Sequence, residues 1–116
     1  MKAVTIGAGC AALLLWGGVA AHAEESAQAR SLAATCFTCH GTDGRSVGGV
    51  PPSLAGQNSE YLLRQMKDLR AGKRPATIMH QQARGYTDRE LELIAGYFAS
   101  VKPGPATPAP AARGGL

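Results

Sequence analysis

The clearest hydrophobic pattern lies near the C-terminus, where apolar residues recur at the spacing of one helix face. Thr87 and Glu90 precede this stripe with the spacing of a capping box, in which the two residues satisfy each other's backbone amides. Pro103 follows and cannot continue a helix. The pattern therefore predicts a helix from residue 87 to about residue 101, with these apolar positions on one face: Leu91, Ile94, Ala95, Phe98 and Val101.

A second amphipathic pattern predicts a helix over residues 60–71. Asn58 or Ser59 can cap its start, because a short polar side chain accepts a hydrogen bond from a first-turn amide. Gly72 stands just after its end, where a left-handed residue commonly closes a helix. The apolar face of this helix is expected to carry Leu62, Met66 and Leu69.

A third helix is expected over residues 24–35, which are rich in good helix formers. Glu24 and Glu25 at its start would suit the positive end of the helix dipole. Its apolar face is made of small residues that permit close helix contact, and the helix ends beside Cys36. These residues are Ala29, Leu32 and Ala33.

The remaining segments lack a sustained period of either kind. Residues 41–56 contain five glycines and two prolines, and they predict a long loop that must be fixed to something. Residues 73–86 predict mostly irregular chain with a short helical turn near 79–83, and residues 103–116 predict a disordered tail rich in Pro and Ala. With no strand pattern, residues 24–102 predict an all-α domain of three main helices plus short turns.

The N-terminal 23 residues predict a cleaved signal peptide. Lys2 is followed by an uncharged apolar stretch over residues 3–21. Ala21 and Ala23 are the small residues that export cleavage requires, and they predict cleavage after Ala23. An uncleaved membrane anchor is the alternative, but four glycines dilute the stretch. Cys10 lies inside it and lacks the context of a lipidation site.

Composition bounds the possible functions. The chain of 116 residues has room for one small domain. Cleavage would leave 11 Lys and Arg against eight Asp and Glu, a net charge of +3 that is too small and too interleaved for a nucleic-acid surface. The expected periplasmic location is oxidising, so a disulfide between the two remaining cysteines is one alternative for them.

The candidate chemistry is concentrated in residues 36–40, Cys-Phe-Thr-Cys-His, which is the attachment signature of a c-type haem. Cys36 and Cys39 can each add to one vinyl group of the porphyrin, and His40 can ligate the iron. The small number of bulky apolar residues is a second argument for haem. So small a domain needs extra stabilisation, which a covalently held haem would provide by completing the core. This predicts a largely unfolded apoprotein.

Two other readings of the same residues are weaker. A dithiol oxidoreductase would place the cysteines at a helix start within a βαβ pattern, and no strand is predicted. A zinc site would need Cys36, Cys39, His40 and the distant His80 together.

A second axial ligand must come from farther along the chain, and the candidates are Met66, Met79 and His80. Met66 belongs to an apolar helix face, where it fills the core. Met79 has no such explanation and is favoured, while His80 and an open coordination position stay as alternatives. Ligation by His and Met raises the potential and leaves no place for a substrate, which favours electron transfer over catalysis.

Several motifs in order give the chain a resemblance to class I cytochromes c, nearest to the cytochrome c4 and c553-like group. These motifs are Cys36 to His40 with Gly41-Thr42-Asp43-Gly44, Pro52 to Gln57, Tyr61-Leu62, Gly72-Lys73-Arg74, Met79, Thr87 to Glu90 and Gly96 to Ser100. The resemblance implies one covalent haem c on Cys36 and Cys39, axial ligands His40 and Met79, and a Pro52 carbonyl that accepts from the His40 ring. It also implies that the first and last helices cross near the haem, with Tyr97 and Phe98 close to the crossing.

The implied function is that of a periplasmic carrier of single electrons, not an enzyme, between a donor dehydrogenase and a terminal oxidase or reductase. The same domain type serves as the haem subunit of flavocytochrome c sulfide dehydrogenases, which is the alternative. Cytochrome c4 has two such domains and one is expected here. Five basic residues cluster in and after the second predicted helix: Arg64, Lys67, Arg70, Lys73 and Arg74. This cluster could steer an acidic partner, or it could be a solvated helix face in which Arg64 pairs with Asp68.

Overall fold

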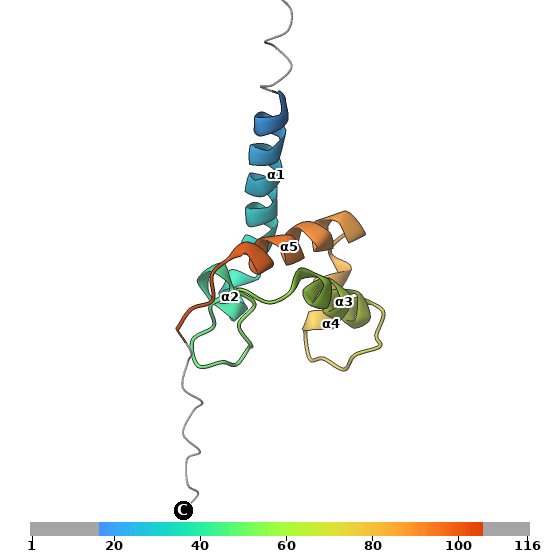
Figure 1. Ribbon diagram of the computed structural model, residues 1–116. Helices are drawn as coiled ribbons and strands as arrows, with labels where there is room; N and C mark the ends of the chain where they lie inside the picture. Colours follow the sequence, from blue (N-terminus) through green and yellow to red (C-terminus); the bar gives the residue numbers. More distant parts are fainter. Residues whose placement is uncertain (1–16, 106–116) are drawn as a thin grey trace, which may run out of the picture.

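The computed structural model describes residues 17–105, which form α-helices and one short 3₁₀-helix with no strand among them (Figure 1). The all-α prediction is thus confirmed. In chain order the elements are α1 (Gly17–Ala34), α2 (Phe37–His40), the 3₁₀-helix η1 (Thr42–Gly44), α3 (Ser59–Arg70), α4 (Met79–Arg84) and α5 (Asp88–Ser100).

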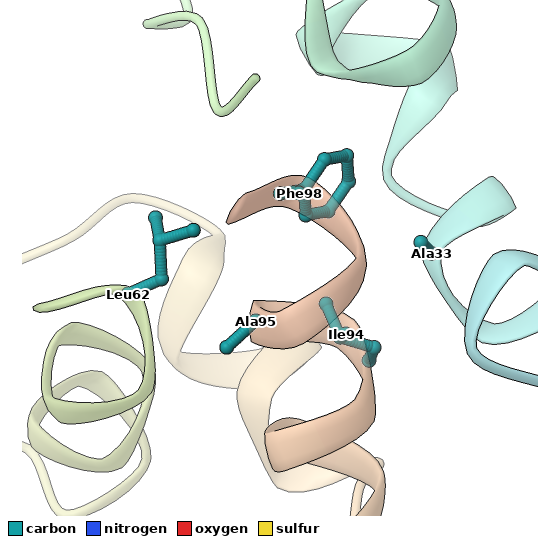
Figure 2. Packing of buried hydrophobic residues seen from close by; sticks show 5 residues of the cluster. All are labelled: Ala33, Leu62, Ile94, Ala95 and Phe98. Atoms are coloured by element: carbon teal, nitrogen blue, oxygen red, sulfur yellow. The ribbon is translucent and has the colours of Figure 1, made fainter. Parts of the chain in front are cut away.

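Helix α5 is the central element of the fold. It packs against α1 on one side and against α3 on another, and α4 packs against α3 (Figure 1). Figure 2 shows side chains of α5 between Leu62 of α3 and Ala33 of α1. The cluster drawn there consists of Ala33, Leu62, Ile94, Ala95 and Phe98.

The core is small. Of the eleven buried apolar residues in the described part of the chain, five are alanines. Phe98 and Leu91 are the largest side chains that are fully buried. Around this core lies a margin of partly buried residues: Leu32, Cys36, Phe37, Leu54, Leu63, Tyr86 and Tyr97.

The predicted starts of α3 and α5 are confirmed. Asn58 caps α3 by accepting from the Tyr61 amide at 2.9 Å. At α5, Thr87 accepts from the Glu90 amide while the Glu90 carboxylate accepts from the Thr87 amide at 2.7 Å, which completes the capping box. The predicted helical turn near residues 79–83 is α4.

The predicted start of the first helix at Glu24 is wrong, because α1 begins at Gly17. No proline or capping residue interrupts the run of Ala and Val before Glu24, so the helix continues through it. The two glutamates therefore lie inside α1, and its first turn holds no acidic residue. Most of the predicted signal peptide lies outside the described residues.

Residues 41–56 form the predicted loop, broken by η1. The chain after α5 lies against this loop: Pro103 is next to Gly56, and the Arg45 Nε donates to the Lys102 carbonyl at 3.1 Å. The tail was predicted to begin at Pro103, which is exposed and lies beside Gly56, and residues 106–116 lie outside the described part. Within residues 17–105, no helix has both the length and the apolar character that a bilayer crossing needs.

Candidate functional site

The two cysteines lie at the single turn of α2, with Cys36 as the residue that precedes the helix and Cys39 within it. The chain leaves α1 at Ala34, and the His40 amide donates to the Cys36 carbonyl at 2.9 Å to close the turn. Residues three apart in a helix lie on the same side, so Cys36 and Cys39 face the same region. Both are free thiols, with Cys36 half-buried and Cys39 exposed.

His40 is buried at the end of α2, and a loop residue orients its ring. The Nδ1 atom lies 2.7 Å from the carbonyl oxygen of Pro52. A carbonyl oxygen only accepts, so Nδ1 carries the hydrogen and donates it. The Nε2 atom of the neutral ring therefore carries the lone pair, which is the form that binds a metal ion.

The loop that presents Pro52 is fixed near its base. The Leu54 amide donates to the Gly44 carbonyl at 2.8 Å, and the Ser46 amide donates to the Ser53 hydroxyl at 3.0 Å. Gly41 allows the turn immediately after His40 with a φ of +82°, a conformation that favours glycine. These contacts hold the Pro52 carbonyl oxygen beside the His40 Nδ1.

The alternative readings of the cysteines find little support. Burial raises the pKa of the Cys36 thiol, although a Thr35 hydrogen bond opposes the change. A dithiol oxidoreductase needs the opposite shift, because its thiolate is the nucleophile. Residues 17–105 contain no group of three His, Cys, Asp or Glu side chains placed to hold a metal ion, so the proposed zinc set is not assembled there.

Met79 is the first residue of α4, and it is half-buried. Helix α4 is anchored on α3, with Ala83 fully buried. In Figure 1, α4 and α2 lie on the same side of α5, under its opposite ends. Among the described residues, no hydrogen bond joins Met79 to the Cys36–His40 segment. His80, also half-buried, is the neighbour of Met79 on α4.

One polar cluster was not predicted from the sequence. The Tyr97 hydroxyl donates to Asp43 at 2.6 Å, and Arg45 and Arg30 lie 3.4 and 3.8 Å from the same carboxylate. Burial, then Asp43, raises the pKa of Tyr97, so the hydroxyl remains a donor. The Tyr97 ring also contacts Phe37 and Phe98, with centroids 6.2 and 5.4 Å away. This cluster ties α1, η1 and α5 together beside α2.

The basic residues near α3 divide into two groups. Lys67 and Arg70 both pair with Asp88 of α5. Arg64 lies over the Tyr61 ring, 5.8 Å from its centroid, and not in the expected pair with Asp68. Lys73 and Arg74 follow in an exposed loop, and no described carboxylate pairs with them.

The residues around α2 fit a covalently attached haem. Two free thiols share one side of a helical turn, and the next residue offers a ring nitrogen with its lone pair available. The adjoining margin of partly buried apolar side chains supplies the surface that a large flat apolar group needs, and it includes Phe37, Leu54 and Leu63.

Comparison with known proteins gives a consistent assignment. The family model described as cytochrome c matches residues 26–102. Cytochrome c4 of Pseudomonas aeruginosa is 44% identical over 85 residues, which cover 73% of this chain and 42% of that protein. The cytochrome subunit of sulfide dehydrogenase of Chlorobaculum tepidum is 43% identical over 70 residues, covering 60% of this chain and 63% of the relative.

A shorter relative is matched over nearly its whole length. Cytochrome c-554(548) of Halomonas halodenitrificans is 36% identical over 81 residues, covering 67% of this chain and 98% of the relative. The chain spans less than half the length of the cytochrome c4 relatives. The matched region contains α2, α3, α4 and α5 in full. The chain therefore belongs to the cytochrome c family, as a class I c-type cytochrome of the cytochrome c4 group with covalently bound haem c.

Proposed function

We propose that the chain is an exported carrier of single electrons, with one haem c attached through Cys36 and Cys39 and ligated by His40 and Met79. When bound, the haem supplies a reversible one-electron couple at its iron. The protein attaches it, fixes its ligands and sets the polarity around it. The observation that carries the proposal is the 2.7 Å contact between His40 Nδ1 and the Pro52 carbonyl, beside two free thiols.

His40 acts as an oriented and strengthened ligand. Donation from Nδ1 to a main-chain carbonyl holds the ring plane and increases the basicity of Nε2. Pro52 contributes only its backbone oxygen, and the loop contacts at Gly44 and Ser53 hold that oxygen in place. This arrangement lets the ring keep one orientation when the charge on the ligated metal changes.

Met79 is proposed as the second protein ligand that would hold the iron. A thioether favours the reduced metal more than an imidazole does, so this ligand set raises the potential. Two protein ligands leave no position for a substrate, which is why we assign electron transfer and no catalysis at the metal. The relatives named cytochrome c4 and cytochrome c-554(548) support this assignment.

The proposed location is the periplasm, after cleavage of residues 1–23 behind Ala23. The proposed partners are redox proteins: a dehydrogenase is the electron donor, and a terminal oxidase or reductase is the electron acceptor. Lys73 and Arg74 are exposed and have no ion-pair partner among the described residues, and Arg64 is exposed as well. Such cations would favour an approach by an acidic partner.

A second candidate is a haem-bearing subunit of a dehydrogenase. Its specific support is the match to the cytochrome subunit of sulfide dehydrogenase of Chlorobaculum tepidum, at 43% identity. Purification of the native protein from its host distinguishes the two functions. A stable complex with a flavoprotein would support the subunit, and an isolated cytochrome that is reduced by a separate donor would support the carrier.

Optical spectroscopy of the purified protein tests the site. We expect c-type bands on reduction and a sulfur-to-iron charge-transfer band on oxidation. Met79→Ala should abolish the sulfur band, while Met66→Leu on α3 and His80→Ala should keep it. Absence of covalent haem would overturn the whole proposal, and a sulfur band that survives Met79→Ala would overturn the role of Met79 alone.

A further inference from the structure

The segment that carries Met79 is hydrogen-bonded to the segment that carries the cysteines. The hydroxyl oxygens of Thr35 and Tyr86 are 2.6 Å apart. Thr35 donates its own hydrogen to the Leu32 carbonyl at 2.9 Å, so the Tyr86 hydroxyl is the donor between them. Among the described residues, no other hydrogen bond and no ion pair joins residues 17–40 to residues 71–86.

Tyr86 is itself held firmly by its main chain. The Arg70 Nη1 donates to the Tyr86 carbonyl at 3.1 Å, and the same guanidinium binds Asp88 at the start of α5. Lys67 adds a second contact to Asp88 at 3.1 Å. Tyr86 therefore stands where the chain leaves α4, fixed to α3 and α5, with its side chain partly buried against the core.

Thr35 is the residue immediately before the attachment motif. Its hydroxyl lies 3.8 Å from the Cys36 Sγ, and the Cys36 side chain packs at the same core margin as Tyr86. A hydrogen bond at this point links the cysteine side of the site to the methionine side. Any movement of residues 71–86 away from α2 that includes Tyr86 must break it.

We propose that Tyr86 is a positioning residue for Met79, which it holds in its ligating position through the hydrogen bond to Thr35. The inference rests on the proposed ligand role of Met79. Since the hydrogen bond exists only while the two segments are together, its loss shifts the balance toward displacement of Met79 by an external ligand. The expected size is about fivefold, as for one net hydrogen bond.

Titration of the oxidised holoprotein with imidazole tests this inference. Binding is monitored through the loss of the sulfur-to-iron band. Tyr86→Phe should raise the apparent affinity for imidazole about fivefold. Tyr61→Phe is the matched control, because the Tyr61 hydroxyl has no hydrogen-bond partner among the described residues, and it should leave the affinity unchanged. Thr35→Val should reproduce the effect of Tyr86→Phe, and Thr35→Ser should restore the original affinity.

Each outcome decides the inference. A Tyr86→Phe protein that binds imidazole like the unmodified protein overturns it, even if its thermal stability falls, because the tyrosine is then only structural. If Tyr86→Phe does not fold, Thr35→Val reports on the same hydrogen bond from its other end, with the same two readings. The unmodified protein separates this inference from the proposed function, since absence of its sulfur band refutes Met79 as a ligand before any variant is compared.

Discussion

His40 and Pro52 lie 12 residues apart in the chain, and the structure joins them by a hydrogen bond of 2.7 Å from the ring Nδ1 to the main-chain oxygen. The donor is a side chain at the end of α2 and the acceptor belongs to a loop without regular structure. The site thus depends on a backbone atom whose position is set by loop packing and not by the type of side chain.

This relationship predicts a protected ring hydrogen. In the reduced holoprotein, the Nδ1 hydrogen of His40 should exchange slowly with water, because the ring is buried and the hydrogen is donated. His80 is half-buried and has no hydrogen-bond partner among the described residues, so its ring hydrogens should exchange quickly. Nitrogen-edited NMR measures both. Equal rates for the two rings would contradict the assigned hydrogen bond.

Local rules predicted the helices of this chain well because their signals are local. The capping box of Thr87 and Glu90 and the cap at Asn58 each need only residues within one turn, and both are present. The start of α1 failed for the same reason. The expectation at Glu24 rested on the helix formers that follow it and on the acidic pair at that point, but residues 17–23 contain no stop signal and α1 runs through them.

Contacts between distant segments were harder to predict. The Cys-x-x-Cys-His pattern at Cys36 indicated haem attachment. The hydrogen-bond acceptor of the His40 ring, in contrast, was expected only from the family resemblance, because nothing in a loop rich in Pro and Gly identifies which carbonyl will accept from that ring. The Tyr97–Asp43 and Tyr86–Thr35 hydrogen bonds had no signal in the sequence at all. Each joins residues more than 50 positions apart, so only the tertiary packing of the helices brings them together.

Gly41 should be intolerant of a side chain. Its φ of +82° disfavours any L-residue, and a Cβ there would clash with the Arg45 carbonyl. Gly72 has a similar φ of +71° but open space around it. Gly72→Ala should therefore cost about 1 kcal/mol, from backbone strain alone. Gly41→Ala should cost about 3 kcal/mol and disturb His40. Denaturant unfolding of the holoproteins gives both values, and equal losses would show that the carbonyl contact is unimportant.

Asp88 should make stability depend on pH. A hydrogen bond from Arg70, and then one from Lys67, lowers the pKa of this carboxyl. Because the folded value is below the unfolded value of about 3.9, the contribution is present above that pH and is lost as the pH falls through the lowered pKa. Asp88→Asn should thus melt below the unmodified protein at neutral pH, and the two should converge in acid. Asp68→Asn is the control, because Asp68 forms no ion pair among the described residues. Its melting temperature, relative to that of the unmodified protein, should not show the same dependence on pH.

Removal of the haem should abolish the cooperative fold. Five of the eleven buried apolar residues among those described are alanines, and only Phe98 and Leu91 are bulky and fully buried, so the protein atoms alone offer little apolar burial against the entropy of ordering the chain. A Cys36→Ser/Cys39→Ser variant cannot form either thioether. Circular dichroism of that variant should show weak helical signal and no sharp thermal transition, whereas His80→Ala, with both cysteines intact, should melt cooperatively. A cooperative transition in the double variant, at the helix content of the holoprotein, would mean that α1, α3 and α5 form a sufficient core by themselves.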